Sequence, residues 1–434
     1  MPAPKIQIIT LGCSKNLVDS QAVERQLRAA GYSAVGEDYR GRTAATVINT
    51  CGFIGDAKEE SIEAVLAACS RRDAGHTGRV YVMGCLSQRY RDDLPGEIPE
   101  VDRWFGKFDW SGIAEALAAD GIAGASRPLP QRPSARSHHA YIKIAEGCNR
   151  FCAFCAIPLI TGRYHSRPVD EIVAEVEALV RRGTCEFNII AQDLSAYGTD
   201  LYGQSALARL LERLAAVEGV ERIRLHYAYP ADFPYDILPV MAAHPNICRY
   251  LDIALQHIDD GVLEGMRRHI TAAETRALLD RIRREVPGIH IRTTLMTGFP
   301  GESDEAFECL LDFVREQRFE RMGAFAYCEE DDTWAARNLA DTIPDEVKQQ
   351  RLDRLMALQQ VIALEINEAK VGSTLPVIID REDEEYYVGR TEYDSPEVDP
   401  EVLVAKTAPL KVGHIYDVTI TGALPFELLG TPAI

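Results

Sequence analysis

Short apolar runs that alternate with amphipathic stretches fill most of this chain, and this alternation constrains the fold more than any other feature. Near the N-terminus the runs are KIQIITLG, ATVINT and RVYVMG. From residue 140 onward they are AYIKIAEG, CEFNIIAQD, ERIRLHYAYP, CRYLDIALQH, IHIRTTLMTG and RMGAFAYC. Strands that alternate with helices pair in parallel sheets. The sequence therefore predicts an α/β fold, with an N-terminal doubly wound parallel sheet and a central partial (β/α)6 barrel.

The pattern divides the chain into three domains, as expected for 434 residues at roughly 150 residues per domain. The N-terminal domain is expected at residues 1–123, a linker rich in Pro, Ser and Arg at 124–137, and the barrel with a long exit helix at 138–370. From residue 371 to residue 434, short strands separated by turn residues predict a small antiparallel β-barrel.

Charge and hydropathy exclude several classes of protein. No apolar run approaches the ~18 residues of a membrane span, and the N-terminus MPAPKIQIIT lacks the layout of a signal peptide, so we expect a cytoplasmic protein with no membrane contact. In a reducing cytosol the eleven cysteines are metal ligands or buried thiols rather than disulfides. The net charge of −19 argues against RNA binding, because phosphate contacts need Lys and Arg, and it suits a basic partner.

The run EGCNRFCAFC carries Cys148, Cys152 and Cys155 in a C-x3-C-x2-C spacing, in the loop after the first predicted barrel strand. Three thiolates can hold an iron–sulfur cluster. On a four-iron cluster they leave one iron open to bind a small molecule. Active sites of such barrels form from these loops. The alternatives are a zinc site, which would need a fourth ligand such as His165, and unrelated core cysteines.

A second set of cysteines shares one position in the predicted N-terminal sheet. Cys13, Cys51 and Cys85 each follow a strand directly. Ligands of doubly wound sheets bind at the carboxyl ends of the strands. We therefore expect these thiols to converge and to hold a second cluster. The alternative is that they are small buried hydrophobic residues, an interpretation that suits the remaining five cysteines better: Cys69, Cys185, Cys248, Cys309 and Cys328.

The segment GCSKNLVD also has a local interpretation. Asn16 can cap the helix that follows, with Asp19 at the third helical position answering it. The helix N-terminus would then lie near Cys13 and favour its thiolate.

With these motifs in place, the chain resembles the methylthiotransferases of the radical S-adenosylmethionine (SAM) superfamily. The runs LGCSKNLVDSQ, NTCGFI and GCLSQ match the N-terminal domain of that family, and EGCNRFCAFCAIP, SRP at Ser166–Pro168 and GFPGE at Gly298–Glu302 match its barrel. The C-terminal module resembles a TRAM domain. One departure is Thr161 before Gly162, where many relatives have Arg; Arg163 is the candidate replacement.

The family has one branch that acts on an isopentenylated adenosine in transfer RNA and another that acts on an aspartate of a ribosomal protein. QDLSAYG at Gln192–Gly198, GCSKNLVDS and RLHYAYP are closer to the ribosomal-protein branch. The resemblance then implies methylthiolation of an aspartate β-carbon in small-subunit ribosomal protein twelve. It also implies an electron donor such as flavodoxin and a sulfur donor.

The resemblance further implies two 4Fe–4S clusters, one on each cysteine set, and SAM as cofactor. The cluster on Cys148, Cys152 and Cys155 would cleave SAM to a 5′-deoxyadenosyl radical, and the other cluster would present the sulfur. Asp193, with Gln192 before it, ends the second barrel strand, where relatives hold the amino group of SAM, and Gln256 ends the fourth. Helix capping and ordinary loop hydrogen bonds are the alternatives for these three residues.

Two rival functions remain open at this point. An RNA-modifying enzyme should carry a basic terminal module, but residues 371–434 hold twelve Asp or Glu and four Lys or Arg, a formal charge of −8. The other rival is a non-catalytic iron–sulfur carrier or electron-transfer protein, which would need neither SAM nor a barrel.

Overall fold

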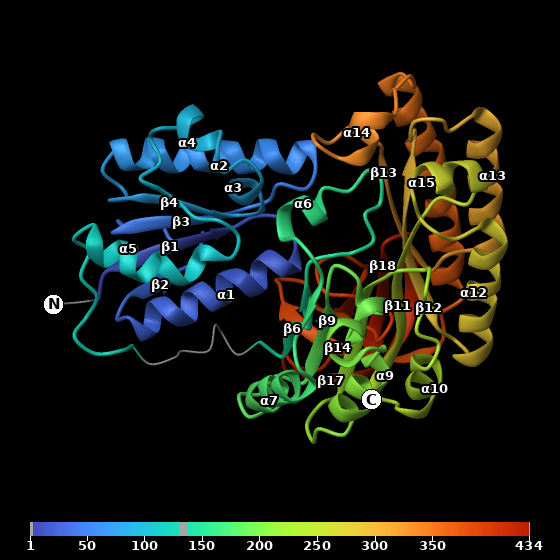
Figure 1. Cartoon of the computed structure of the whole chain (residues 1–434). Helices are drawn as coiled ribbons and strands as arrows, with labels where there is room; N and C mark the ends of the chain where they lie inside the picture. Colours follow the sequence, from blue (N-terminus) through green and yellow to red (C-terminus); the bar gives the residue numbers. More distant parts are fainter. Residues whose placement is uncertain (1–2, 130–136, 434) are drawn as a thin grey trace.

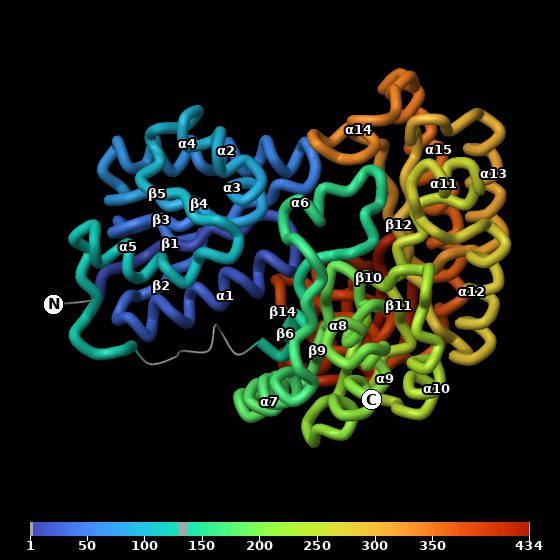
Figure 2. The backbone as a smooth tube through the Cα atoms, in the orientation of Figure 1, coloured from blue at the N-terminus to red at the C-terminus, as the bar shows by residue number. Residues whose placement is uncertain are grey.

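A computed structural model describes residues 3–129 and 137–433. Figures 1 and 2 show an N-terminal α/β unit beside a larger central unit, with the C-terminal strands packed against the central one. The predicted fold class is confirmed. Most of the predicted linker 124–137 lies outside the described residues.

The N-terminal unit is a five-stranded parallel sheet with the order β2-β1-β3-β4-β5. Its strands are β1 (Lys5–Thr10), β2 (Ser33–Val35), β3 (Ala45–Thr50), β4 (Val80–Gly84) and β5 (Arg103–Trp104). Its helices are α1 (Ser14–Ala29), α2 (Gly55–Asp73), α3 (Cys85–Arg89), α4 (Leu94–Glu97) and α5 (Ile113–Ala119). The short edge strands β2 and β5 were not predicted.

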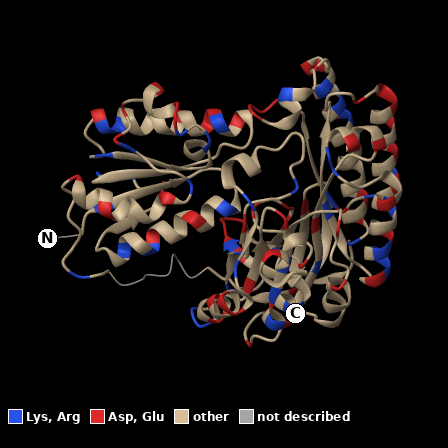
Figure 3. Ribbon diagram, viewed as in Figure 1, with Lys and Arg blue, Asp and Glu red and all other residues tan. Residues whose placement is uncertain are grey.

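Helices cover both faces of this sheet, as doubly wound folds require. Val47 and Ile48 are neighbours in β3, yet Val47 packs in the core cluster beside α1 and α5, and Ile48 packs in the cluster beside α2 and α3. In Figure 3 the ribbons of the sheet strands are almost wholly tan, whereas those of α1 and α2 include blue and red residues. The strand order reverses between β1 and β3, and this is where such sheets bind ligands.

The central unit is an open sheet of six parallel strands in the order β13-β12-β11-β10-β9-β6, which is the predicted partial barrel. The strands are β6 (His139–Lys143), β9 (Glu186–Ile190), β10 (Arg222–Ala228), β11 (Ile247–Gln256), β12 (His290–Thr297) and β13 (Arg321–Ala326). A small antiparallel pair, β7 (Ala145–Glu146) and β8 (His165–Ser166), flanks the cysteine loop.

The longer helices pack on the outer face of the sheet. They are α7 (Val169–Val180), α9 (Leu207–Ala215), α10 (Ile237–Ala243), α12 (Ala272–Glu285) and α13 (Asp304–Gln317). Four short helices lie in the loops that follow the strands: α6 (Ile157–Thr161), α8 (Thr199–Tyr202), α11 (Asp260–Gly265) and α14 (Trp334–Asn338). The exit helix α15 (Asp345–Glu368) packs along β13 and α13 and leads to the C-terminal module.

The C-terminal module is a closed five-stranded barrel with the order β14-β15-β16-β18-β17. Its strands are β14 (Thr374–Glu382), β15 (Tyr386–Arg390), β16 (Glu401–Ala405), β17 (Ile415–Leu424) and β18 (Glu427–Pro432). The last strand, β18, was not predicted, and it pairs in parallel with β16 while the other pairings are antiparallel.

The segment from Arg390 to Asp399 joins this module to the central unit by contacting all six strands. Arg390 pairs with Glu186 of β9, and Asp394 accepts a bond from Arg321 Nε of β13 at 3.0 Å. The remaining contacts are Pro396 with Tyr141 of β6, Thr391 with Arg224 of β10, and Asp399 with Tyr250 of β11 and Arg292 of β12. Apart from Tyr141, which is central in β6, the contact residues lie in the first half of their strands. The module therefore closes the amino end of the partial barrel and leaves the carboxyl end for chemistry.

Candidate functional site

The C-x3-C-x2-C loop lies between β7 and α6, at the carboxyl end of β6. Cys148 and Cys152 are buried, and Cys155 is partly buried, directly before α6. The guanidinium of Arg268 donates from Nη1 to Cys152 Sγ at 3.2 Å, and the backbone N–H of Arg150 donates to Cys148 Sγ at 3.5 Å. Burial raises the pKa of Cys148 to about 11, which shows that a thiolate here is costly without polar contacts. The two donors supply such contacts.

A glycine is required where this loop begins. Gly147 has φ +82°, and an added Cβ would lie 2.1 Å from Arg163 O. The loop therefore folds back against the backbone at Gly162 and Arg163. The Arg163 guanidinium lies 4.8 Å from the ring centre of Phe151, so it faces the cysteine loop, as a replacement for the missing Arg at position 161 would have to.

The N-terminal cysteines follow three neighbouring strands of the first sheet. Cys13 precedes α1, Cys51 follows β3, and Cys85 opens α3 after β4. The structure brings them together: a Cβ added to Gly12 would lie 2.9 Å from Cys51 Sγ, and Cys85 Sγ donates to Asn16 Oδ1 at 3.6 Å. The three thiols therefore share the crevice at the strand-order reversal.

The predicted capping role of Asn16 and Asp19 is wrong. Helix α1 begins at Ser14 with Cys13 at the N-cap position, so Asn16 is already inside the first turn. The buried Asn16 side chain donates instead to Leu11 O at 2.8 Å and to Thr50 O at 3.1 Å, which ties α1 to the ends of β1 and β3. Asp19 is an ion-pair partner of Lys107. Tertiary contacts outcompeted the local cap here.

The helix terminus nevertheless acts on Cys13 as expected. Cys13 is exposed as a residue, but its thiol is partly desolvated in the crevice, which raises its pKa. The charge of Lys15 and the backbone N–H groups of Asn16 and Lys15 outweigh this desolvation and lower the pKa. Burial dominates at Cys85 and raises the pKa to about 12.

The two cysteine sets meet across the interface between the two units. Cys85 packs with Ala156 and Ile160, which follow Cys155 in the chain. An ionic contact lies beside them, where Lys58 and Arg89 of the N-terminal unit pair with the buried Glu330 at 2.9 and 2.6 Å. Figure 1 shows α6 reaching toward the carboxyl edge of the N-terminal sheet.

The residues expected to bind SAM share an unusual property. Gln192 and Asp193 follow β9, and Gln256 ends β11, so all three lie at the carboxyl edge of the central sheet. Gln192 Oε1, Asp193 Oδ1 and Gln256 Oε1 are buried, yet each is without a hydrogen-bond partner among the described residues. Buried polar atoms are normally paired. All three atoms are acceptors, so this edge fits a ligand with a donor such as an amino group.

Asp193 is held ready for a cation. Its Oδ2 accepts from Arg150 Nε at 2.6 Å, and its Oδ1 is free for a ligand within the described chain. Burial raises the pKa of Asp193, and this effect outweighs the opposite influence of the positive charge on Arg150. Gln256 has φ +72°, a strained conformation that turns the chain at the strand end.

Each cysteine set has the donor chemistry for an iron–sulfur cluster. All eleven cysteines lie in the described ranges, and none is in a disulfide. In those ranges no group of three His, Cys, Asp or Glu side chains is placed to hold one metal ion. His165, the fourth ligand that a zinc site would need, is exposed, with Nδ1 4.0 Å from Asp200 Oδ2.

Sequence reasoning missed the charged residues that surround these cysteines. Lys107, Arg268 and Glu330 are all buried, and each reaches across from a segment distant in sequence. The only signal was their charge in otherwise short loops, which is too common to single them out.

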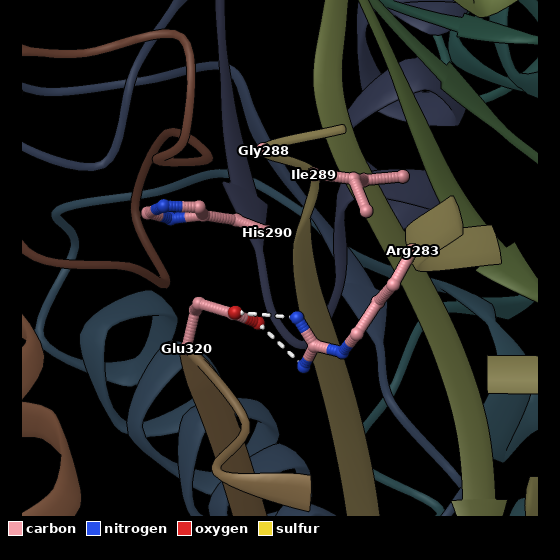
Figure 4. Close-up of a pocket in the computed structure, with 5 residues that line it drawn as sticks. All are labelled: Arg283, Gly288, Ile289, His290 and Glu320. Carbon is pink, nitrogen blue, oxygen red and sulfur yellow. Dashed lines mark hydrogen bonds and ion pairs between the residues drawn. The ribbon is translucent and has the colours of Figure 1, made fainter. Parts of the chain in front are cut away.

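A pocket of about 190 Å³ lies far from this site (Figure 4). It is formed by Arg283, Gly288, Ile289, His290 and Glu320, and the guanidinium of Arg283 pairs with Glu320 at 2.7 Å. His290 opens β12, so the pocket is at the amino end of the sheet, opposite the cysteines.

No helix in the described chain is both long enough and apolar enough to cross a membrane.

Three family profiles match the chain along its length. The uncharacterized protein family UPF0004 matches residues 5–106, the radical SAM superfamily residues 142–314 and the TRAM domain residues 371–432. The radical SAM match starts in β6 and includes the C-x3-C-x2-C loop.

Solved structures that resemble the chain show its fold alone. The radical S-adenosylmethionine methyltransferase TsrM from Kitasatospora setae is 16% identical, with 75% of this chain and 72% of that chain covered and a TM-score of 0.55. The cobalamin-dependent S-adenosylmethionine radical enzyme OxsB is 10% identical, with 83% and 56% covered and a TM-score of 0.52.

Curated relatives are much closer in sequence. The ribosomal protein uS12 methylthiotransferase RimO of Phocaeicola vulgatus is 56% identical over 425 residues, and that of Parabacteroides distasonis is 53% identical over 434 residues, each with 98% of both chains covered. The RimO of Flavobacterium johnsoniae is 48% identical over 432 residues, with 99% of this chain and 98% of the relative covered. The chain therefore belongs to the RimO family of ribosomal protein uS12 methylthiotransferases.

Proposed function

We propose that this chain is a radical SAM methylthiotransferase that modifies the β-carbon of an aspartate in ribosomal protein uS12. It holds two 4Fe–4S clusters, one on each cysteine set. The ligands are Cys148, Cys152 and Cys155 in the central unit and Cys13, Cys51 and Cys85 in the N-terminal unit. We propose domain limits of 1–123, 138–370 and 371–434.

One observation carries this proposal: two cysteine sets from different sheets meet at one interface, where Cys85 packs against the helix that follows Cys155. An iron–sulfur carrier or electron-transfer protein would need neither SAM nor a barrel, whereas one cysteine set here lies in a loop of the partial barrel. A transferase that starts a radical on one side and delivers sulfur from the other needs this arrangement, because proximity and orientation supply much of the barrier lowering.

The residues of the central unit bind and orient SAM. Asp193, with its unpartnered Oδ1, would receive the amino group of SAM, and the amide oxygens of Gln192 and Gln256 supply further acceptors. A cluster held by Cys148, Cys152 and Cys155 would supply the electron for cleavage of SAM. Arg268 donates to Cys152 Sγ and stabilises the negative charge on that ligand.

The C-terminal barrel offers an acidic surface for the basic ribosomal substrate. A groove of about 360 Å³ is lined by Glu397, Val398, Asp399, Pro400, Glu401, Phe426 and Glu427. Phe426 and Val398 are more than half exposed, at 54% and 59%. Asp399 is buried against Arg292, and Glu401 pairs with Arg381, so Glu397 and Glu427 are the carboxylates of this groove that face a partner. Carboxylates beside exposed apolar side chains suit a basic polypeptide, and they do not suit a nucleic-acid backbone.

We infer a cytoplasmic enzyme that depends on an electron donor such as flavodoxin and on a sulfur donor.

The deciding experiment is the mass of uS12 from cells with and without this gene. We expect the protein from gene-containing cells to be heavier by one methylthio group, located on an aspartate by fragmentation. The RNA-modifying rival would be established if uS12 had the same mass in both kinds of cell and the cells without the gene lacked methylthiolated adenosine in their transfer RNA. Production of 5′-deoxyadenosine from SAM by the reconstituted protein excludes the electron carrier.

A further inference from the structure

Four charged side chains form a closed ring at the interface between the N-terminal and central units. Two cations and two anions alternate around it: Lys107, Asp19, Lys143 and Glu146. Lys107 Nζ lies 2.8 Å from Asp19 Oδ2 and 3.9 Å from Glu146 Oε1. Lys143 Nζ pairs with Asp19 and lies 2.6 Å from Glu146 Oε2.

The ring joins the segments that carry the two cysteine sets. Asp19 is in α1, which starts directly after Cys13, and Lys107 follows β5 of the same sheet. Lys143 ends β6 and Glu146 ends β7, two residues before Cys148. Glu146 also accepts a hydrogen bond from Gln192, one of the proposed SAM-binding residues. Each ion pair across the ring therefore fixes the N-terminal crevice against the radical SAM loop.

Lys107 occupies a special place in this ring, because it lies beside the N-terminal cysteines. Its backbone N–H donates to Gln88 Oε1 at 3.0 Å, on the short helix that Cys85 opens. Asn16 and Asp19 are one turn apart on α1, and residues at this spacing share a helix face. Cys85 contacts Asn16, and Lys107 contacts Asp19. The thiol and the ammonium group thus approach the same face of α1.

The ammonium ion of Lys107 is almost fully shielded from water, with 2% of the residue exposed. Such burial is costly for a cation unless counter-charges surround it. Lys107 is therefore a fixed positive charge at the crevice, held by Asp19 and Glu146 and bonded through its backbone to the helix that Cys85 opens. Such a charge acts on a cluster bound in the crevice, because screening by solvent is weak inside the protein.

We infer that Lys107 is a positioning residue that, anchored by Asp19 and Glu146, holds the N-terminal cysteine crevice against the radical SAM loop and raises the reduction potential of the cluster bound in that crevice. The inference rests on the proposed function, since it requires a cluster on Cys13, Cys51 and Cys85. A nearby positive charge stabilises the more negative, reduced cluster, so the potential rises. The device would set how readily the sulfur-bearing side accepts an electron.

The test uses the full chain with Cys148, Cys152 and Cys155 changed to Ala, so that only the N-terminal set can bind a cluster. After reconstitution, the midpoint potential is measured by a redox titration followed by electron paramagnetic resonance. We expect Lys107→Met to move the midpoint to a more negative value and Lys107→Arg to restore most of it. Asp19→Asn removes a negative charge from the same ring and should move the midpoint potential to a more positive value.

Lys58→Met is the matched control, because Lys58 is also a lysine of the N-terminal unit that pairs across the interface, with Glu330 at 2.9 Å. It should leave the midpoint unchanged. An unchanged potential in Lys107→Met, or an equal shift in Lys58→Met, would overturn the inference. If Lys107→Met fails to fold, the sign of the shift in Asp19→Asn decides. Absence of any cluster signal in the parent variant would instead overturn the proposed function, so the two failures are distinguishable.

In the enzyme with both cysteine sets intact, Lys107→Met should also raise the ratio of 5′-deoxyadenosine to methylthiolated product, because SAM cleavage proceeds while sulfur delivery falters. A ratio equal to that of the wild type would argue against a positioning role.

Discussion

Replacing Gly52 with Ala should disrupt the N-terminal cysteine site while sparing the radical SAM site. An added methyl group at Gly52 would lie 2.7 Å from both Cα and N of Leu86 and 2.9 Å from the carbonyl carbon of Cys85. Non-bonded carbons prefer separations of about 3.5–4.0 Å, so the two segments must part by roughly 1 Å. The obstructing atoms belong to the backbone, which cannot rotate away as a side chain could.

The magnitude follows from how firmly the obstructing segment is held. Ser87 Oγ donates to Phe105 O at 2.6 Å, and Leu86 is buried in the core cluster on that face of the sheet. Overpacking of this kind costs about 1–3 kcal/mol, which corresponds to a fall of several degrees in the unfolding midpoint. Metal sites tolerate ligand displacements of only ~0.2 Å, so moving Cys51 away from Cys85 should prevent cluster binding.

The assay combines thermal unfolding, iron content and 5′-deoxyadenosine formation. We expect about half of the wild-type iron, little methylthio product and near-normal SAM cleavage. Gly96→Ala is the control, because nothing lies within 4 Å of a Cβ added at that position in the same unit. Wild-type iron content and unfolding midpoint in Gly52→Ala would refute the reasoning.

Three further predictions test other parts of the molecule. Cys152→Ala should abolish 5′-deoxyadenosine formation and remove about half of the iron, whereas Cys51→Ala should keep SAM cleavage and lose the methylthio product; the reverse pattern would exchange the roles of the two sets. The double variant Glu384→Ser, Glu385→Ser, in the turn between β14 and β15, should slow capture of uS12 and weaken the salt dependence of association measured by stopped flow. The double variant Glu59→Ser, Glu63→Ser removes the same charge from an exposed part of the N-terminal unit and serves as the control. Identical association rates for the two double variants would exclude this turn from docking. Burial opposes ionisation of Asp394, but Arg321 and Lys370 lower its pKa to about 2. Its contribution of about 2 kcal/mol to the free energy of unfolding is therefore present above pH ~4 and is lost as the pH falls toward 2. Urea unfolding between pH 6 and pH 3 should show a steeper loss of stability for the wild type than for Asp394→Asn, and parallel curves would contradict this.

Local patterns in the sequence were sufficient for the parallel sheets, the position of each cysteine after a strand and the family. Periodicity reports which face of an element is buried, and a cysteine directly after a parallel strand must lie at the carboxyl edge of its sheet. The short edge strands β2 and β5 escaped because three or two residues show no period. Strand β18 was not predicted because Gly and Pro in ELLGTP indicate a turn rather than a strand. Its strand conformation depends on pairing with β16, which is distant in sequence.

Only the tertiary structure decided what surrounds the cysteines. Asn16 and Asp19 form a plausible cap when taken alone. In the folded chain Asn16 donates instead to a buried carbonyl of β3, and Asp19 pairs with Lys107. The same holds for Arg390 and Asp394, which look like solvated charges in sequence yet close the amino end of the partial barrel. Ion pairs between segments that are 88 or 204 residues apart leave no local trace in the sequence, because their energy depends on a distance and a degree of burial that exist only after the chain has folded.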